Sequence, residues 1–372
     1  MEADGIVESP PSTTRYHFTH YFMGEIKPLK EWIKDKNIVF KFINACFRGM
    51  GQPVFLNNPI SGLLVLAALF VQNPWQAINA LLGLISAQLM SMVLCQDRGG
   101  VENGGFAFQG LLIGSIVTAI SAEEDWYGWL SFPVVCLGAG SVFVSSALNN
   151  LFGRVSLPAF NLSFNLVTFL FVTATTHSND FFPQKPVAAT IPWIGNDVDW
   201  AEIFKGLPRG IGQCYGCDDV VSGCLVAAAM AICSPIILWH AIWGSFIGII
   251  VGISLACPLD LLYNGVMGYN SVLTACSIGG VFMLISLRVH LLAIVSAVIA
   301  AVTSLALFQF LAVLGLPMLA FPFCAIAALF LLVTTEGDYF VKIPLDQVTW
   351  PEDHWKRYHR MNITVQNSNE LM

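Results

Sequence analysis

The residues best suited to chemistry in this sequence are amides and aromatic rings that recur at equal spacing. Gln52 and Gln213 each accompany a segment that helix-breaking residues interrupt. Two further patterns each occur twice. An aromatic residue followed by an amide and then a leucine occurs as Phe108, Gln109 and Leu112 and again as Tyr269, Asn270 and Leu273. A Leu-Pro pair ahead of a phenylalanine occurs at Leu157 to Phe164 and again at Leu316 to Phe323. Amide oxygens accept hydrogen bonds, and flat rings can form the walls of a slot.

This combination suits the passage of a small, neutral, planar solute. Removing such a solute from water costs several kcal/mol unless other acceptors replace the lost water. Broken helix ends expose backbone carbonyls, glutamine adds side-chain oxygens, and facing rings exclude hydrated ions and bulky molecules. The alternative is that these residues only pack helices together, and it stays open for any single one of the 27 phenylalanines.

An internal repeat relates these positions. Shifted by 161 residues, Ser61–Ala68 lies over Ser222–Ala229 with six identities in eight, and Gln52 lies over Gln213. Five membrane spans in each copy is an odd number, so the second copy must be inserted upside down. Inverted repeats place a solute site near the membrane midplane, between broken helices.

Composition indicates that most of the surface faces lipid. Of the 372 residues, 56% are hydrophobic and 11% are charged, whereas soluble domains carry about 25% charged residues. The net charge of −7 comes without clusters of Lys and Arg, so nothing indicates nucleic-acid binding. Membrane lipids are the expected surroundings.

A spanning helix needs about 20 apolar residues. The sequence therefore predicts an all-α integral membrane protein with ten transmembrane helices plus re-entrant broken helices, in two inverted repeats of five spans. The expected spans are 59–72, 75–95, 107–121, 128–149, 156–176, 220–236, 238–257, 268–286, 290–313 and 317–335. The expected organisation is a cytosolic N-terminal tail over 1–49, repeat 1 over 50–176, an extracellular linker over 177–208, repeat 2 over 209–335 and a cytosolic C-terminal tail over 336–372. Within 24–50 we expect an amphipathic helix on the cytosolic face, with a soluble cap as the alternative.

The distribution of basic residues sets the expected orientation. Placing the N-terminus in the cytosol and crossing ten times puts 14 of the 17 Lys and Arg residues on the cytosolic side. The acidic loop Glu123–Asp125 then falls outside. We expect a multi-pass protein of the plasma membrane with both termini in the cytosol.

Other chemistries find little support. No acidic or basic relay inside the expected spans could couple protons or sodium, and His240 and His290 are isolated in the sequence. A membrane-embedded enzyme would need a nucleophile–base pair or a metal cluster at bilayer depth, and a non-transporting scaffold would not need paired polar breaks. Cys214 and Cys217 form a C-x-x-C, but no second pair accompanies it at zinc-site spacing. We expect neither enzymatic activity nor a cofactor.

Over roughly residues 30–350 the chain resembles the urea transporter family. The resemblance rests on Phe55–Gly62, Val71–Trp75, Cys95–Arg98, Ser146–Asn149, Gly212–Asp218, Gly268–Ser271 and Leu316–Phe323. It implies a homotrimer with one pore per protomer and facilitated, bidirectional diffusion of urea. The implied filter has aromatic slots at Phe55, Phe108 and Tyr269, ladder-end glutamines at Gln52 and Gln213, and apolar walls at Leu112 and Leu273.

The central site departs from the family pattern. The family has Thr three residues after the Leu-Pro pair in both repeats, and here these positions hold Asn161 and Ala320. The resemblance implies that both face the narrowest point. The same fold tuned to water, ammonia or another small amide therefore stays open as an alternative to urea.

Overall fold

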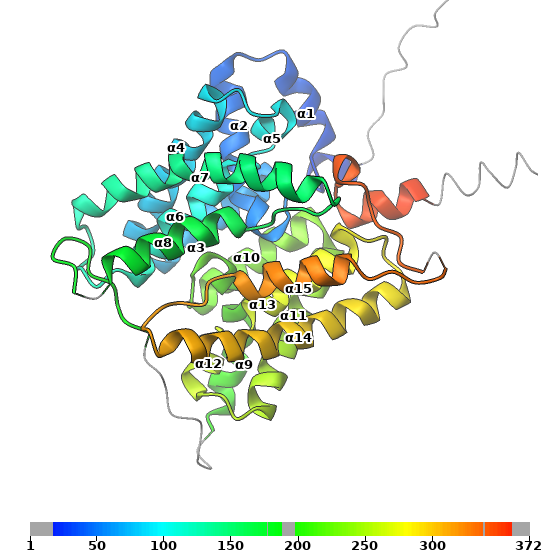
Figure 1. The fold of residues 1–372 in the computed structure, drawn as a ribbon. Helices are drawn as coiled ribbons and strands as arrows, with labels where there is room; N and C mark the ends of the chain where they lie inside the picture. Colours follow the sequence, from blue (N-terminus) through cyan, green and yellow to red (C-terminus); the bar gives the residue numbers. More distant parts are fainter. Residues whose placement is uncertain (1–17, 177, 188–197, 338, 359–372) are drawn as a thin grey trace, which may run out of the picture.

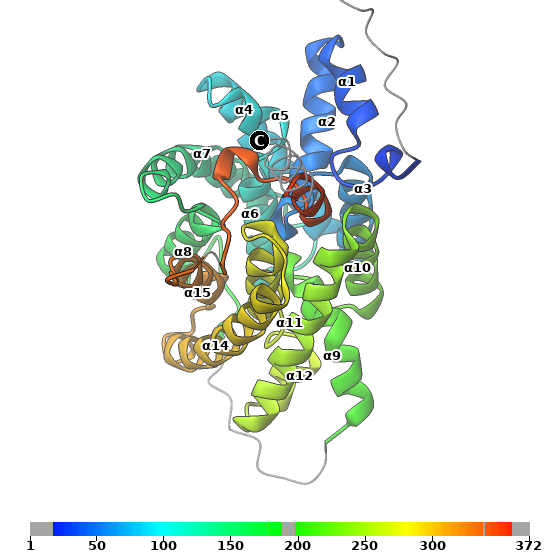
Figure 2. The same ribbon diagram turned by 90° about the vertical axis from the view of Figure 1, so that its right-hand side faces the viewer.

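The computed structural model describes residues 18–176, 178–187, 198–337 and 339–358, and these residues fold into helices without a strand (Figure 1). The helices are α1 (Lys27–Lys34), α2 (Ile38–Gly51), α3 (Pro59–Gln72), α4 (Pro74–Val93), α5 (Arg98–Glu102), α6 (Ala107–Ile120), α7 (Ser131–Gly153), α8 (Leu162–Thr175), α9 (Trp200–Gly212), α10 (Val220–Cys233), α11 (Pro235–Ser254), α12 (Leu259–Tyr263), α13 (Tyr269–Cys276), α14 (Leu287–Ala312) and α15 (Phe321–Leu331). The helices α1 and α2 lie at one end of the molecule, and α9 and α12 lie at the opposite end (Figure 2).

Several helices are long and apolar enough to cross a membrane. By length and composition, four in the described part of the chain qualify: α4, Gly128–Gly153, α11 and α14. Two bent pairs qualify when each is taken together, Ile38–Val54 with α3 at 73° and Trp200–Tyr215 with α10 at 72°. A helix lies in each of the ten ranges expected to span, but α6, α8, α13 and α15 have only 8 to 14 residues. Ten complete spans therefore stay a prediction.

Capping residues followed by proline fix where these helices begin. Asn58 accepts hydrogen bonds from the backbone N–H groups of Ile60 and Ser61, and Pro59 stands in the first turn of α3. Asn73 with Pro74 does the same for α4. Ser234 caps α11, which starts at Pro235. These local signals break the apolar stretches at fixed points, so the chain turns sharply between neighbouring helices.

Contacts recur at the 161-residue offset of the sequence. Ser61 Oγ donates to the Ala229 carbonyl at 2.7 Å, and Ser222 Oγ donates to the Ala68 carbonyl at 2.9 Å. These reciprocal bonds join the start of each helix to the end of the other, so α3 and α10 pack antiparallel. Left-handed backbone also recurs at this offset, or at 159 for the last two pairs: Phe55 and Gly216, Cys95 and Ala256, Gly104 and Gly265, Ser156 and Gly315, Phe160 and Leu319.

The N-terminal region differs from its prediction. Instead of one amphipathic helix within 24–50, the chain forms α1 and α2, because Asn37 starts a new helix by accepting from the Phe40 N–H at 3.2 Å. Residues 45–46 and 48–51 of α2 are buried. The expected boundary after residue 49 therefore falls inside α2, and the one after residue 208 falls inside α9. Both helices lead directly into the bends before α3 and α10.

Glycine permits a close approach of α4 and α6 in the first half. Gly83 in α4 lies against the carbonyl of Gly110 in α6, and a Cβ atom at either position would collide with the carbonyl of the other. Gly140 in α7, by contrast, has no atom near the position its Cβ would take. The separation of α4 and α6 thus depends on the absence of side chains at two positions.

We expect Gly83→Ala to force α4 and α6 apart and to destabilise the protein by about 1–3 kcal/mol. Gly140→Ala is the matched control and should stay within about 1 kcal/mol of the wild type. Thermal unfolding of the purified variants in detergent measures both. Equal stability of the two variants would show that the close contact between α4 and α6 does not determine the stability of the protein.

Candidate functional site

Two partly open cavities are lined by eight of the nine residues expected to line a pore. The first, here called the Gln213 cavity, has a volume of about 240 Å³. Its lining includes six of the nine: Leu112, Asn161, Gln213, Tyr269, Leu273 and Ala320. The second, here called the Gln52 vestibule, has a volume of about 260 Å³ and includes Gln52 and Phe55. Phe108 lines neither cavity. None of the residues that line the two cavities is charged.

The two glutamines are held in matching ways. Gln52 Nε2 donates to the carbonyl of Asn103 at 2.9 Å, and Gln213 Nε2 donates to the carbonyl of Asn264 at 2.9 Å. In both cases the acceptor lies 51 residues further along the chain. Among the described residues neither Oε1 atom has a hydrogen-bond partner, so each side-chain oxygen is left as a free acceptor at its cavity.

Amides from α6 and α13 close the breaks that precede α8 and α15. Gln109 donates to the Phe160 carbonyl at 3.0 Å and accepts from the Phe164 N–H at 2.9 Å. In the second half, Asn270 makes the equivalent bonds, at 3.4 Å to the Leu319 carbonyl and 3.3 Å from the Phe323 N–H. Both side chains are buried. They hold broken backbone in place rather than face a solute.

Asn161 and Ala320 stand at these breaks and line the Gln213 cavity. The side chain of Asn161 caps no backbone group and makes no hydrogen bond within the described chain. Its carbonyl and NH₂ are therefore available at the cavity. Ala320 has no polar side chain, and its own N–H donates to Asn165 Oδ1 at 3.0 Å. Asn165 reaches it from α8, so the first half of the chain holds the break in the second half.

The aromatic residues expected to form slots lie in different places. Phe55 and Tyr269 line different cavities, and Phe55 instead joins three other rings: Phe160, Phe282 and Phe323. Four edge-to-face contacts close this cluster, with centroid separations between 4.9 and 6.2 Å. We call it the phenylalanine cluster. It connects the lining of the Gln52 vestibule with the residues that adjoin the Gln213 cavity.

Two of these rings, Phe55 and Phe282, have no aromatic counterpart in the other repeat. Phe282 follows the break at Gly279 and Gly280, where Gly280 has a φ of 131°. The position equivalent to Phe282 in the first half is Ser121, and the position equivalent to Phe55 in the second half is Gly216. The two rings meet at a centroid separation of 5.8 Å, so the cluster is asymmetric where the sequence suggested symmetry.

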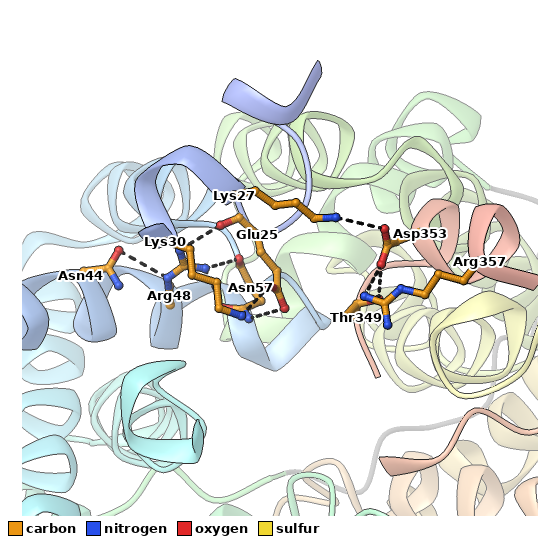
Figure 3. A network of polar contacts seen from close by, with 9 residues as sticks. All are labelled: Glu25, Lys27, Lys30, Asn44, Arg48, Asn57, Thr349, Asp353 and Arg357. Atoms are coloured by element: carbon orange, nitrogen blue, oxygen red, sulfur yellow. Dashed lines mark hydrogen bonds and ion pairs between the residues drawn. The ribbon is translucent and has the colours of Figure 1, made fainter. Parts of the chain in front are cut away.

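Two arginines upstream of the glutamines were also missed. Arg48 is buried and donates to the Asn57 carbonyl at 2.8 Å and to the Glu25 carbonyl at 2.9 Å (Figure 3). Arg209 donates to Glu202 at 2.7 Å and to the Tyr263 carbonyl at 2.9 Å. The signal was present, because Arg48-Gly-Met-Gly-Gln52 and Arg209-Gly-Ile-Gly-Gln213 agree in four of five positions. The repeat thus extends upstream into α2 and α9.

The cysteines and histidines gather into no metal site in the described ranges, where no three metal-ligating side chains come together. Cys214 and Cys217 are buried free thiols, and Cys214 lines the Gln213 cavity. His290 Nδ1 lies 3.2 Å from His240 Nε2, so these two histidines form a pair that their distance in sequence did not indicate.

Long apolar helices and two cavities with uncharged linings indicate a membrane protein with space for a small neutral solute. The chain belongs to the urea transporter family, whose sequence model (UT: Urea transporter) matches residues 43–335. It is 38% identical to urea transporter 1 of Rattus norvegicus over 337 residues, which cover 90% of this chain and 88% of the relative. The proteins of the same name from Ovis aries and Mus musculus are 37% identical with the same coverage.

We expect Gln109→Leu to destabilise the protein strongly, because it leaves the Phe160 carbonyl and the Phe164 N–H buried without partners. The expected cost is about 1–3 kcal/mol for each group. Gln109→Asn is the matched control: it keeps both functional groups on a shorter side chain, as Asn270 does, and should cost clearly less. Thermal unfolding in detergent measures the difference, and equal losses in both variants would contradict the proposed role.

Proposed function

We propose that this protein passes urea down its concentration gradient through a channel-like path inside each protomer. The path runs from the Gln52 vestibule past the phenylalanine cluster to the Gln213 cavity. The observation that carries the proposal is that both cavities lack charged lining residues but carry free amide acceptors. Relatives at 37 to 38% identity are named urea transporter 1.

The chemistry of the path suits a neutral amide. The free Oε1 atoms of Gln52 and Gln213 accept hydrogen bonds from urea as it leaves water at either end, and Asn161 offers a further acceptor and donor between them. Exchange of hydrogen bonds with water for hydrogen bonds with protein keeps the cost of dehydration low. Hydrated ions find no opposite charge along the path and keep their water. The rings of the phenylalanine cluster touch, so passage requires movement of at least one of them.

The proposed setting combines what the sequence pattern and the family resemblance imply. Ten spans form two inverted repeats of five, now extended upstream to include α2 and α9, and three protomers assemble with one pore each. The protein lies in the plasma membrane with both termini and the Gln52 vestibule on the cytosolic side. The reciprocal bonds between α3 and α10 support inversion, since an antiparallel pair of equivalent helices is what it requires.

A second candidate is the same path conducting water, ammonia or another small amide. The specific observation behind it is that the unpaired Asn161 side chain and the small Ala320 share the Gln213 cavity, where the family has threonines. One side of the site then holds an extra donor and acceptor, while the other holds neither.

Flux measurements on proteoliposomes test the proposed function. We expect the purified protein to raise urea permeability far above that of empty liposomes and to raise water permeability much less. Ala320→Phe should remove most of the urea flux by filling the Gln213 cavity, whereas Leu170→Phe, on an exposed face of α8, should leave it unchanged. Fast water flux without urea flux would favour the second candidate. Absence of both would refute the proposed path.

Asn161→Thr and Ala320→Thr probe the asymmetry of the central site. Loss or gain of one hydrogen bond should change the binding free energy of the solute by about 0.5–1.5 kcal/mol. This corresponds to a change in its affinity for the site by a factor of about 2 to 12. We expect Ala320→Thr to strengthen urea binding at that side and Asn161→Thr to weaken it at the other, so that the half-saturating urea concentration moves in opposite directions. If the wild type, both single variants and the double variant conduct alike, these residues do not govern the barrier.

A further inference from the structure

The C-terminal segment folds back over the Gln52 vestibule. After α15 the chain returns to the break that follows α13, where the Leu284 N–H donates to the Val341 carbonyl at 2.8 Å and the Ile343 N–H donates to the Phe282 carbonyl at 2.9 Å. Residues 351–358 then form a helix that lies near α1 at the same end of the molecule (Figures 1 and 2). All these C-terminal residues lie beyond the stretch that matches the family model.

Two residues of this segment line the vestibule itself. Val348 and Thr349 stand in its lining together with Gln52, Phe55 and Phe282. Both side chains are half-buried. Asp346, three residues before Thr349, is exposed and is not part of the lining. A segment outside both repeats therefore supplies part of the wall next to the phenylalanine cluster.

Several contacts anchor the segment at this place. Trp350 is buried with its ring against Gly24. Glu352 accepts from Ser234 Oγ at 2.7 Å at the N-terminus of α11, where a carboxylate is favoured. Asp353 lies 3.5 Å from Lys27 and 2.6 Å from Arg357 (Figure 3).

His354 connects the two walls of the vestibule. The Thr349 N–H donates to His354 Nε2 at 2.8 Å, so Nε2 carries no proton in this arrangement. The other ring nitrogen, Nδ1, lies 3.1 Å from the Gly280 carbonyl and must donate to it. The neutral imidazole thus joins Thr349 to the broken segment that carries Phe282. A proton on Nε2 would replace the acceptor that the Thr349 N–H requires.

We propose that Val348 and Thr349 are pore-wall residues that narrow the mouth at the Gln52 vestibule, and that neutral His354 is the positioning residue that holds them there. The proposal rests on the proposed function, because it concerns the same path. It assigns a role in solute passage to a segment outside both repeats.

Protonation should loosen this wall. Burial lowers the pKa of His354 below its usual value of 6.5. The Gly280 carbonyl, Asp353 and the Gln347 carbonyl act in the opposite direction and Arg357 in the same direction, but burial is the largest effect. The docked segment therefore binds fewer protons than a released one. Its docking is fully stabilised above pH of about 6.5 and weakens as pH falls through the lowered pKa, by up to about tenfold per pH unit.

Thiol modification tests whether Thr349 lines the path. Thr349→Cys is labelled in detergent with a bulky cationic methanethiosulfonate reagent, reconstituted and assayed for urea flux, with labelling checked by intact mass. We expect most of the flux to be lost and to return after reduction. The matched control, Asp346→Cys, and the equally treated wild type, which has exposed thiols at Cys95, Cys136 and Cys224, should keep their flux. Unchanged or increased flux in fully labelled Thr349→Cys overturns the proposal.

A pH profile tests the role of His354. The measured quantity is the permeability of N,N′-dimethylurea relative to urea, which should rise in the wild type as pH is lowered from about 7.5 to about 5. His354→Gln keeps an acceptor for the Thr349 N–H but does not titrate, so its ratio should match the wild type at the higher pH and stay flat. His354→Ala should show a raised ratio at every pH. A flat profile in the wild type, or the same slope in His354→Gln, refutes the positioning role.

The two levels of inference fail in different ways. If the untreated wild type shows no urea flux, the proposed function fails. If it conducts urea but labelled Thr349→Cys conducts equally well, only the role of the C-terminal segment fails.

Discussion

Every backbone N–H and C=O group released by a helix break inside an apolar environment must find a partner, and the rest of this structure depends on that requirement. The breaks before α8 and α15 are possible because Gln109 and Asn270 reach across from neighbouring helices and bind both a carbonyl and an N–H. Only then can Asn161 remain unbonded at a cavity. The polar groups available to a solute are those that make no hydrogen bond within the folded protein.

Close packing brings these breaks to one place. Glycine in α4 and α6 lets backbone approach backbone, and the serine bonds between α3 and α10 join the two halves. Asn165 then ties α8 to the break at Ala320. The cavities are thus products of contacts between halves, and neither half would form them alone.

Much of this arrangement could be predicted from the sequence, for identifiable reasons. Apolar length is a local property of the chain, and each stretch expected to span contains a helix. The repeat marks equivalent residues without any knowledge of contacts, which is how Gln52 and Gln213 were found. Phe282 and Thr349 have no repeat partner, and their positions depend on a glycine kink and on docking of a distant segment. The region expected to hold an amphipathic helix contains two helices, because an apolar pattern can continue across a capping residue such as Asn37.

Because the C-terminal segment docks at one mouth of the path, residues at the two mouths are under different constraints on substitution. A change inside either repeat alters contacts on which the other repeat relies, as the bond between Asn165 and Ala320 illustrates. Val348 and Thr349 lie after both copies and touch only one mouth. Natural selection can therefore change that mouth without disturbing the contacts between the two repeats. A blocker that binds there would contact a segment that lies beyond the residues matched by the family model, whereas a blocker of the interior would contact the matched part of the chain.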